Sequence, residues 1–305
     1  MFLFTVAFLL ATCDPADPPP PLPPLLSRVA EEADAFRQNI TKTVSQETLE
    51  QRALMAPSRF HPRIGQAATE PPKSRFRVRQ IVSEYTIGTL KETGSDDLHE
   101  FRQVVSADGR AIQSVENARH ALALGMRSQD DRIRKRMLED FAKHGLVDIA
   151  ADYGLILLEF TRRGLDSIAI TAGGESHIGT QLCLALNWKQ TSPEGGQLAF
   201  SGRRTVRLPL AGTLWVRKSD GVPLRVQAWA EYPENGHKVR DEATVEYALS
   251  AHGFLTPVSV GHRHTVDGTL MTENLYRYEP FKMFSSDAEI KFTELPDPPA
   301  PANKP

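Results

Sequence analysis

Two histidines near the end of the chain have the spacing that most suggests chemistry. His262 and His264 lie two apart in a strand-like run, so their imidazoles share one face of a strand. If Asp267-Gly268 forms a two-residue turn, the returning strand places Glu273 opposite His262. Two imidazoles and one carboxylate could bind Zn²⁺ or Fe²⁺. The structural alternative is a cross-strand His–Glu ion pair near the tip of a hairpin.

Other signatures of catalysis are missing from the sequence. It contains no Walker A, GxGxxG, HExxH or CxxC pattern. The segment Gly174–Gly179 partly matches the nucleophile-elbow motif, which requires a glycine two residues after the serine. The residue two after Ser176 is Ile178, so the motif is incomplete. Ser176 and His177 are adjacent, so on a strand they point to opposite faces and cannot form the usual nucleophile–base contact. We therefore predict a protein without enzyme activity and without a cofactor.

The elements that would position the two histidines form the clearest pattern in the chain. Taking Asn235-Gly236 as a two-residue loop places Val226 opposite Val245 and Arg225 opposite Glu246. One register thus gives an apolar face and a salt-bridged face, as cross-strand pairing requires. The last third of the chain is therefore predicted to be an antiparallel meander. Its four turn pairs are Asp220-Gly221, Asn235-Gly236, His252-Gly253 and Asp267-Gly268.

Earlier parts of the chain alternate between the periodicities of strands and helices. A period of two from Arg75 onward predicts a long strand, and apolar residues at three-to-four spacing predict a helix over Ser128–His144 that ends at Gly145. Similar spacing predicts an amphipathic helix over Leu25–Ile40. Further strands are expected at Leu98–Val105, Leu155–Thr161, Asp166–Ala172 and Ile178–Lys189.

The first 13 residues have the composition of an export signal. The apolar run Met1–Leu10 is shorter than the roughly 20 residues that span a bilayer, and it is followed by small residues. Leu10–Cys13 also resembles a bacterial lipobox, in which the cysteine is lipidated, although Thr12 departs from the Gly, Ala or Ser of that pattern. We expect lipidation of Cys13 to attach the protein to a membrane; ordinary signal-peptidase cleavage is the alternative.

Composition sets the organisation of the chain and excludes one class of partner. The formal net charge of −2 over 305 residues argues against a nucleic-acid-binding protein. Prolines cluster at both ends, which indicates an extended tether and a disordered tail. The predicted segments are a signal peptide or lipoprotein signal (1–13), a Pro-rich tether (14–24), an N-terminal helical segment and linker (25–74), a half-barrel domain (75–293) and a Pro-rich disordered tail (294–305).

Three short motifs resemble the outer-membrane lipoprotein-sorting, or LolA/LolB-like, superfamily. They are Gly212–Arg225 with its G-x-L-W-V start, Gly253–Pro257, and the aromatic segment Tyr276–Phe281. Glu100–Arg110 resembles a group of exported bacterial proteins, often acidobacterial, that have no assigned function. The resemblance covers residues 75–293 and implies an α+β fold. Its core would be a long curved antiparallel sheet, an unclosed half-barrel, with a few helices packed on its concave side.

The resemblance also implies an apolar cavity, which relatives use for lipids or lipoprotein acyl chains. We therefore expect a noncatalytic envelope protein, periplasmic or membrane-tethered, that binds such a ligand. The alternatives are an envelope protein–protein interaction module filled by its own helices, or a metal-dependent enzyme that rests on the two histidines. The residues expected to line the cavity are Trp215, Val226, Tyr247, Phe254 and Tyr276; in an ordinary packed core the same residues would need no ligand.

Overall fold

A computed structural model of the protein describes residues 22–55, 74–89, 98–128, 132–149, 152–191, 197–201 and 204–284. The predicted signal, Cys13 and the predicted C-terminal tail lie outside these residues. Its helical elements are α1 (Leu22–Ile40), α2 (Val115–Ser128), α3 (Arg132–Lys143), the 3₁₀ helix η2 (Tyr153–Phe160) and α4 (Arg162–Leu165).

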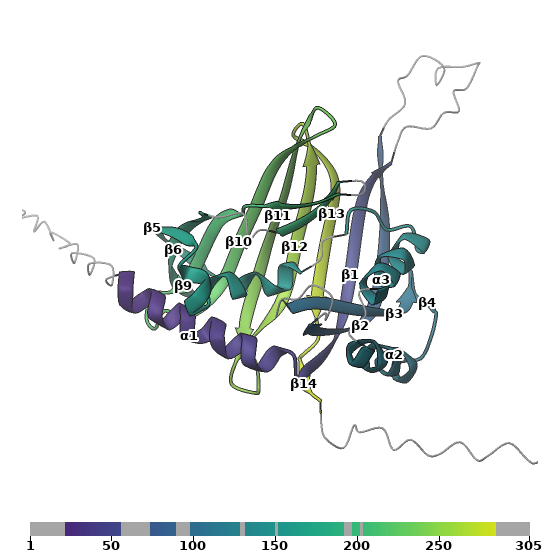
Figure 1. The fold of residues 1–305 in the computed structure, drawn as a ribbon, viewed down its shortest axis with the longest axis horizontal. Helices are drawn as coiled ribbons and strands as arrows, with labels where there is room; N and C mark the ends of the chain where they lie inside the picture. The colour runs from purple at the N-terminus through teal and green to yellow at the C-terminus, as the bar shows by residue number, and fades with distance from the viewer. Residues whose placement is uncertain are drawn as a thin grey trace, which may run out of the picture.

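Among the described residues all helical elements end by Leu165, and only strands follow (Figure 1). The strands are β1 (Thr43–Met55), β2 (Arg75–Thr89), β3 (Leu98–Ala107), β4 (Arg110–Ala111), β5 (Ile168–Ile178), β6 (Gln181–Gln190), β7 (Gln197–Ser201), β8 (Arg204–Leu208), β9 (Ala211–Arg217), β10 (Pro223–Glu234), β11 (His237–Leu249), β12 (Leu255–Val266), β13 (Thr269–Tyr278) and β14 (Lys282–Met283).

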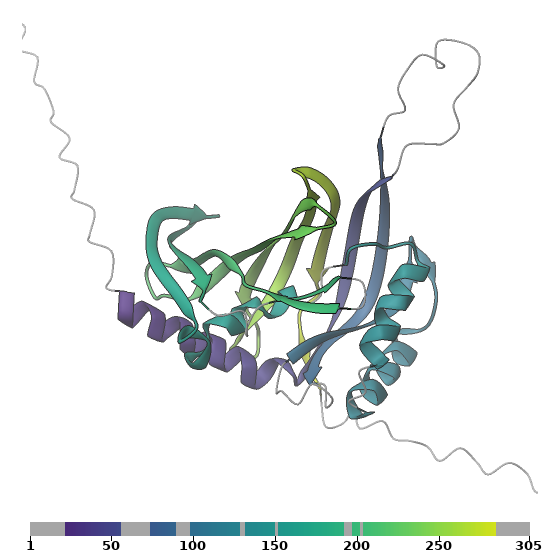
Figure 2. The same cartoon turned by 45° about the horizontal axis from the view of Figure 1, so that its top comes forward.

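Twelve strands form one curved antiparallel sheet. Their order is β4-β3-β2-β1-β13-β12-β11-β10-β9-β6-β5, with β14 paired to one end of β1, and β7 and β8 form a separate two-stranded sheet. The two end strands, β4 and β5, do not pair with each other, so the sheet curves without closing (Figure 2). The predicted α+β half-barrel is therefore confirmed.

The hairpin between β10 and β11 has the register that its turn predicts. Val226 pairs with Val245 and Arg225 pairs with Glu246. Asn235 and Gly236 both have positive φ, 49° and 83°, as a type I′ turn requires. Turn chemistry and side-chain alternation therefore determine this part of the sheet together.

Strand β1 was not expected from the sequence. Residues 43–55 fall in the stretch predicted to be a helical segment and linker, yet β1 pairs with β2 on one side and with β13 on the other. Its residues that face the concave side include Ser45, Glu47 and Gln51, all buried. A half-buried strand is recognised in a sequence by alternating apolar residues, and polar residues occupy several of the inward positions here, so the pattern did not indicate a strand.

Helices lie on both faces of the sheet. The apolar stripe of α1, which includes Val29, Ala33 and Phe36, is fully buried on the concave side, and the Phe36 ring meets the Tyr247 ring edge-on at 6.1 Å. Helix α2, which was not predicted, covers the opposite face of β2 and β3, where Leu122 packs on Phe101. No helix among the described residues is long and apolar enough to cross a membrane.

Several predicted boundaries and one predicted element differ from the structure; β5 and β6, for example, are Ile168–Ile178 and Gln181–Gln190. Helix α1 begins at Leu22 rather than Leu25, because prolines are tolerated in the first turn of a helix. Helix α3 begins at Arg132, and Gly145, with φ of 77°, follows its end as predicted. The predicted strand Leu155–Thr161 is wrong: this apolar run is η2, and a short buried helix and a buried strand cannot be distinguished from such a run.

Candidate ligand site on the concave face

One segment of the chain lies across the hollow of the half-barrel. It comprises Leu146–Ile149 and Asp152–Thr161, and we name it the strap; η2 forms most of it. In Figure 2 this helix lies in the hollow of the curved sheet. The strap is held by side chains from β1, β3, β11 and β13 that bond its backbone, and by apolar packing of its own side chains.

The first part of the strap is bound by amide side chains. Gln51 on β1 donates to the Val147 carbonyl oxygen at 2.7 Å and accepts from the Val147 N–H at 3.0 Å. Asn274 on β13 donates to the carbonyl oxygen of Asp148 at 2.9 Å, and it accepts from Gln51 at 2.7 Å. The hydroxyl of Thr272 donates to the Asp148 carboxylate at 3.0 Å. Side chains of two neighbouring strands thus form hydrogen bonds with the backbone of Val147 and Asp148.

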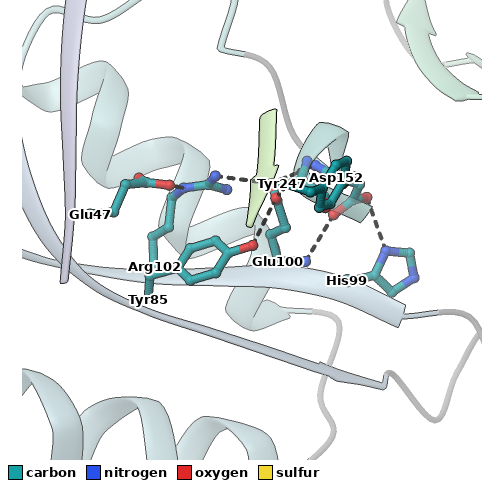
Figure 3. A network of polar contacts seen from close by, with 8 residues as sticks. Glu47, Tyr85, His99, Glu100, Arg102, Asp152 and Tyr247 are labelled. Atoms are coloured by element: carbon teal, nitrogen blue, oxygen red, sulfur yellow. Dashed lines mark hydrogen bonds and ion pairs between the residues drawn. The ribbon is translucent and has the colours of Figure 1, made fainter. Parts of the chain in front are cut away.

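The second part of the strap is bound by a carboxylate and a phenol. Glu100 on β3 accepts the N–H groups of Asp152 at 2.7 Å and of Gly154 at 3.0 Å. The hydroxyl of Tyr247 on β11 donates to the Gly154 carbonyl oxygen and accepts from the Leu157 N–H, both at 3.1 Å. Figure 3 shows Glu100, Tyr247 and Asp152 meeting at the start of η2.

A buried network of ion pairs and hydrogen bonds holds the Glu100 side chain in place. Arg102 donates to both carboxylate oxygens of Glu47, at 2.7 and 2.9 Å, and to Glu100 at 2.9 Å, while Tyr85 donates to Glu100 at 2.9 Å. The side chains of Arg102, Glu47 and Glu100 are each 1% exposed, so solvent screens the pairs little. Burial raises the pKa of Glu47 although Arg102 opposes that rise. Because both carboxylates counter the effect of burial, the pKa of Arg102 is raised well above its ordinary value.

The apolar side of the strap faces the floor of the hollow. Leu155, Ile156, Leu157 and Phe160 are buried in the same core as the strands, and the Phe160 ring meets the Trp188 ring at 5.3 Å. These side chains therefore occupy the surface on which the sequence predicted an apolar ligand.

Four of the five predicted cavity residues belong to this core, and one does not. Val226, Tyr247, Phe254 and Tyr276 are buried together with α1 and η2. Trp215 is only half-buried and lies under the Arg225 guanidinium, 5.9 Å from its ring centre, on the face of the sheet opposite to its buried neighbours Leu214 and Val216. The alternation of β9 therefore removes Trp215 from the concave face.

The two histidines do converge, but on a different carboxylate. His262 Nε2 and His264 Nδ1 lie 3.2 and 2.8 Å from the same oxygen of Asp241, and Tyr232 donates to its other oxygen at 2.7 Å. Although burial opposes ionisation, the hydrogen bonds from His262 and His264 hold the pKa of Asp241 well below its usual range. The hydrogen bond to Asp241 in turn raises the pKa of His264.

The predicted pairing of His262 with Glu273 is wrong by one residue. A β-bulge between β12 and β13 shifts the register, so His262 pairs with Asn274 and Glu273 pairs with Arg263. Glu273 accepts from Arg263 at 3.0 Å and from Arg52 at 2.8 Å, and so takes part in ion pairs away from the histidines. Within the described part of the chain, no group of three or more His, Cys, Asp or Glu residues could hold a metal ion.

No family model matches this sequence, and no curated protein matches it. Solved structures do. A DUF1329 family protein from Desulfovibrio piger is 11% identical with a TM-score of 0.36, covering 86% of this chain and 94% of that one. A LolA superfamily protein from Nitrosomonas europaea is 11% identical with a TM-score of 0.30, covering 85% and 94%.

The structure of MucB in complex with MucA(peri) is 12% identical with a TM-score of 0.19, covering 86% of this chain and 98% of that one. The superfamily that the sequence motifs resemble is thus among these structures.

Proposed function

We propose that this protein is a noncatalytic, exported binding protein that holds an apolar ligand on the concave face of its half-barrel. The observation that carries the proposal is the strap. Its eight-residue helix covers an apolar floor that includes Trp188, Val226 and Val245, and it joins the sheet through side-chain contacts rather than through strand pairing. A ligand that took the place of the strap would bury the same apolar surface, which stabilises a complex by about 25 cal/mol per Å² before ordering costs.

The contacts we propose for the ligand follow from the concave surface. Val226, Tyr247, Phe254 and Tyr276 lie in the core that the strap and α1 cover. A lipid, a lipoprotein acyl chain or an apolar segment of another protein would each find an apolar surface there. The competing function is an interaction module whose hollow is permanently filled, and the complete burial of Leu157 and Phe160 favours that alternative.

The experiment that separates these functions is native mass spectrometry of the exported chain, purified without harsh detergent and then incubated with envelope extract. A bound apolar adduct, identified by fragmentation, supports the binding protein. A mass that stays free of adducts after incubation overturns it in favour of the interaction module.

We also propose that residues 1–13 direct export and that Cys13 is lipidated, with residues 14–24 as the tether. The mass of the mature N-terminus tests this directly. A diacylglyceryl-modified N-terminal Cys13 is expected, together with loss of membrane fractionation in Cys13→Ser. Cleavage at another residue without lipid would overturn lipidation and leave export in place.

A further inference from the structure

We infer that the ligand of the concave face is an apolar peptide segment, recognised through its backbone as the sheet recognises the strap. This inference rests on the proposed function, because it names the class of ligand that the same site takes. It comes from the polar atoms of the hollow, whereas the proposed function comes from its apolar floor.

The sheet contacts the strap as a receptor contacts a peptide. Gln51 bonds both the N–H and the carbonyl oxygen of Val147, and Tyr247 bonds the carbonyl oxygen of Gly154 and the N–H of Leu157. Asn274 and Glu100 supply further backbone contacts from two other strands. Backbone recognition of this kind provides affinity for a peptide irrespective of its side chains.

An acyl chain in the same place could not replace the hydrogen bonds that these polar groups make to the strap. Gln51, Glu100, Asn274 and Tyr247 are all buried, at 4% exposure or less, and hydrocarbon can neither donate to them nor accept from them. A buried polar group that loses its partner is costly, and for a carboxylate the cost is larger. The polar lining of the hollow therefore discriminates against a lipid tail and in favour of a peptide.

The structure also gives the sequence preference of such a peptide. A β-carbon at residue 154 would lie 2.5 Å from Glu100 Oε1 and 3.3 Å from the Tyr85 hydroxyl oxygen. Glu100 is held in this position, because Arg102 and Tyr85 both donate hydrogen bonds to its carboxylate. The position between Glu100 and Tyr247 therefore requires glycine. The residues that follow it are aliphatic, as Leu155, Ile156 and Leu157 are in the strap.

The test uses the full chain and a fluorescent peptide of residues 152–161 that carries two added C-terminal lysines for solubility. Gly154→Ala should weaken the strap in its own hollow and leave the hollow intact. We expect this variant to bind the peptide at least tenfold more tightly than the unmodified chain does, by fluorescence anisotropy. A peptide with alanine at the position of Gly154 should bind at least tenfold more weakly.

A matched control separates release of the strap from general loosening. In Gly173→Ala the new β-carbon would lie 2.8 Å from the Ala185 carbonyl oxygen, a comparable clash placed in β5. This variant should bind the peptide no better than the unmodified chain. If Gly154→Ala does not fold, Phe160→Ala weakens the packing of the strap on Trp188 and leaves every side chain that bonds the peptide backbone in place.

An apolar dye or an acyl-chain probe distinguishes the two ways to fail. The peptide inference is overturned, and the proposed function stands, if the variant with the weakened strap binds the probe and not the peptide. The same holds if that variant binds the peptide with glycine at position 154 and the peptide with alanine there equally well. If the folded variant binds neither probe nor peptide, both are overturned.

Discussion

Glu100 and Gly154 are fitted to each other without space for a side chain. The carboxylate accepts the Gly154 N–H at 3.0 Å, and the same oxygen would lie 2.5 Å from a β-carbon at that residue. The Glu100 carboxylate is also shielded from water, because it is buried and accepts hydrogen bonds from Arg102 and Tyr85. A strand residue and a strap residue 54 positions apart therefore depend on each other.

Arg102→Met should reveal how much the network behind Glu100 contributes to stability. The substitution leaves the carboxylates of Glu47 and Glu100 buried without their cation, and breaking a buried pair in this way costs about 3–5 kcal/mol. Urea unfolding measures the loss. Arg52→Met is the matched control: its pair with Glu273 is exposed, with 46% of the Arg52 side chain accessible, and should cost less than about 1 kcal/mol. Equal losses in the free energy of unfolding for the two variants would show that Arg102 does not stabilise the buried carboxylates as we expect.

Tyr247→Phe should loosen the strap more than the sheet. The variant removes one hydroxyl that bonds both Gly154 and Leu157, and the loss of such a buried group costs about 1–3 kcal/mol. Amide hydrogen exchange at Leu157 should accelerate, while exchange along β10 and β11 stays slow. In the control Tyr232→Phe, the lost hydroxyl bonds Asp241 instead, and the Leu157 amide should stay protected. Unchanged exchange at Leu157 in Tyr247→Phe would show that this hydroxyl does not hold the strap.

Much of the sheet could be predicted because its information is local. Asn235 and Gly236 adopt the positive φ angles that their types favour, and that turn alone sets the pairing of Val226 with Val245. The bulge between β12 and β13 has no comparable signal. It moves every pairing beyond it by one residue, which is why His262 meets Asn274 instead of Glu273.

The candidate site could not be predicted for a different reason. Glu47, Glu100 and Arg102 are charged residues on the inward face of strands, where sequence patterns are interpreted as solvent-facing. Each is stable there only because the other two are present, and a single sequence does not show that residues 47 and 102 meet. The strap was misjudged because its aliphatic run fits a strand, whereas its amides pair with side chains of other strands.

The Asp241–His264 pair should make stability depend on pH in two opposite ways. The pKa of His264 is raised in the folded state, so its contribution is complete below the unfolded value of about 6.5 and is lost as pH rises through the folded value. The pKa of Asp241 is lowered, so its contribution is present above about 3.9 and is lost as pH falls through the folded value.

His264→Gln tests the first of these directions. The difference in free energy of unfolding between the unmodified chain and the variant should be larger at about pH 5.5 than at about pH 8.5, measured by urea titration. His237→Gln serves as control, because that histidine is mostly exposed and solvent screens its pair with Asp267. A difference for His264→Gln that grows toward alkaline pH would contradict the raised pKa.

Phe160→Ala should show that the strap is part of the core and not only a cover attached by polar contacts. The Phe160 ring is completely buried against Trp188, so its removal leaves a cavity and costs about 3–5 kcal/mol in urea unfolding. Leu158→Ala removes a half-buried side chain from the same helix and should cost less, about 1 kcal/mol. Tryptophan fluorescence adds a local reading, because Trp188 gains access to water in the first variant alone. If Phe160→Ala costs no more than Leu158→Ala and leaves the emission unchanged, the end of the strap does not pack on Trp188 in solution.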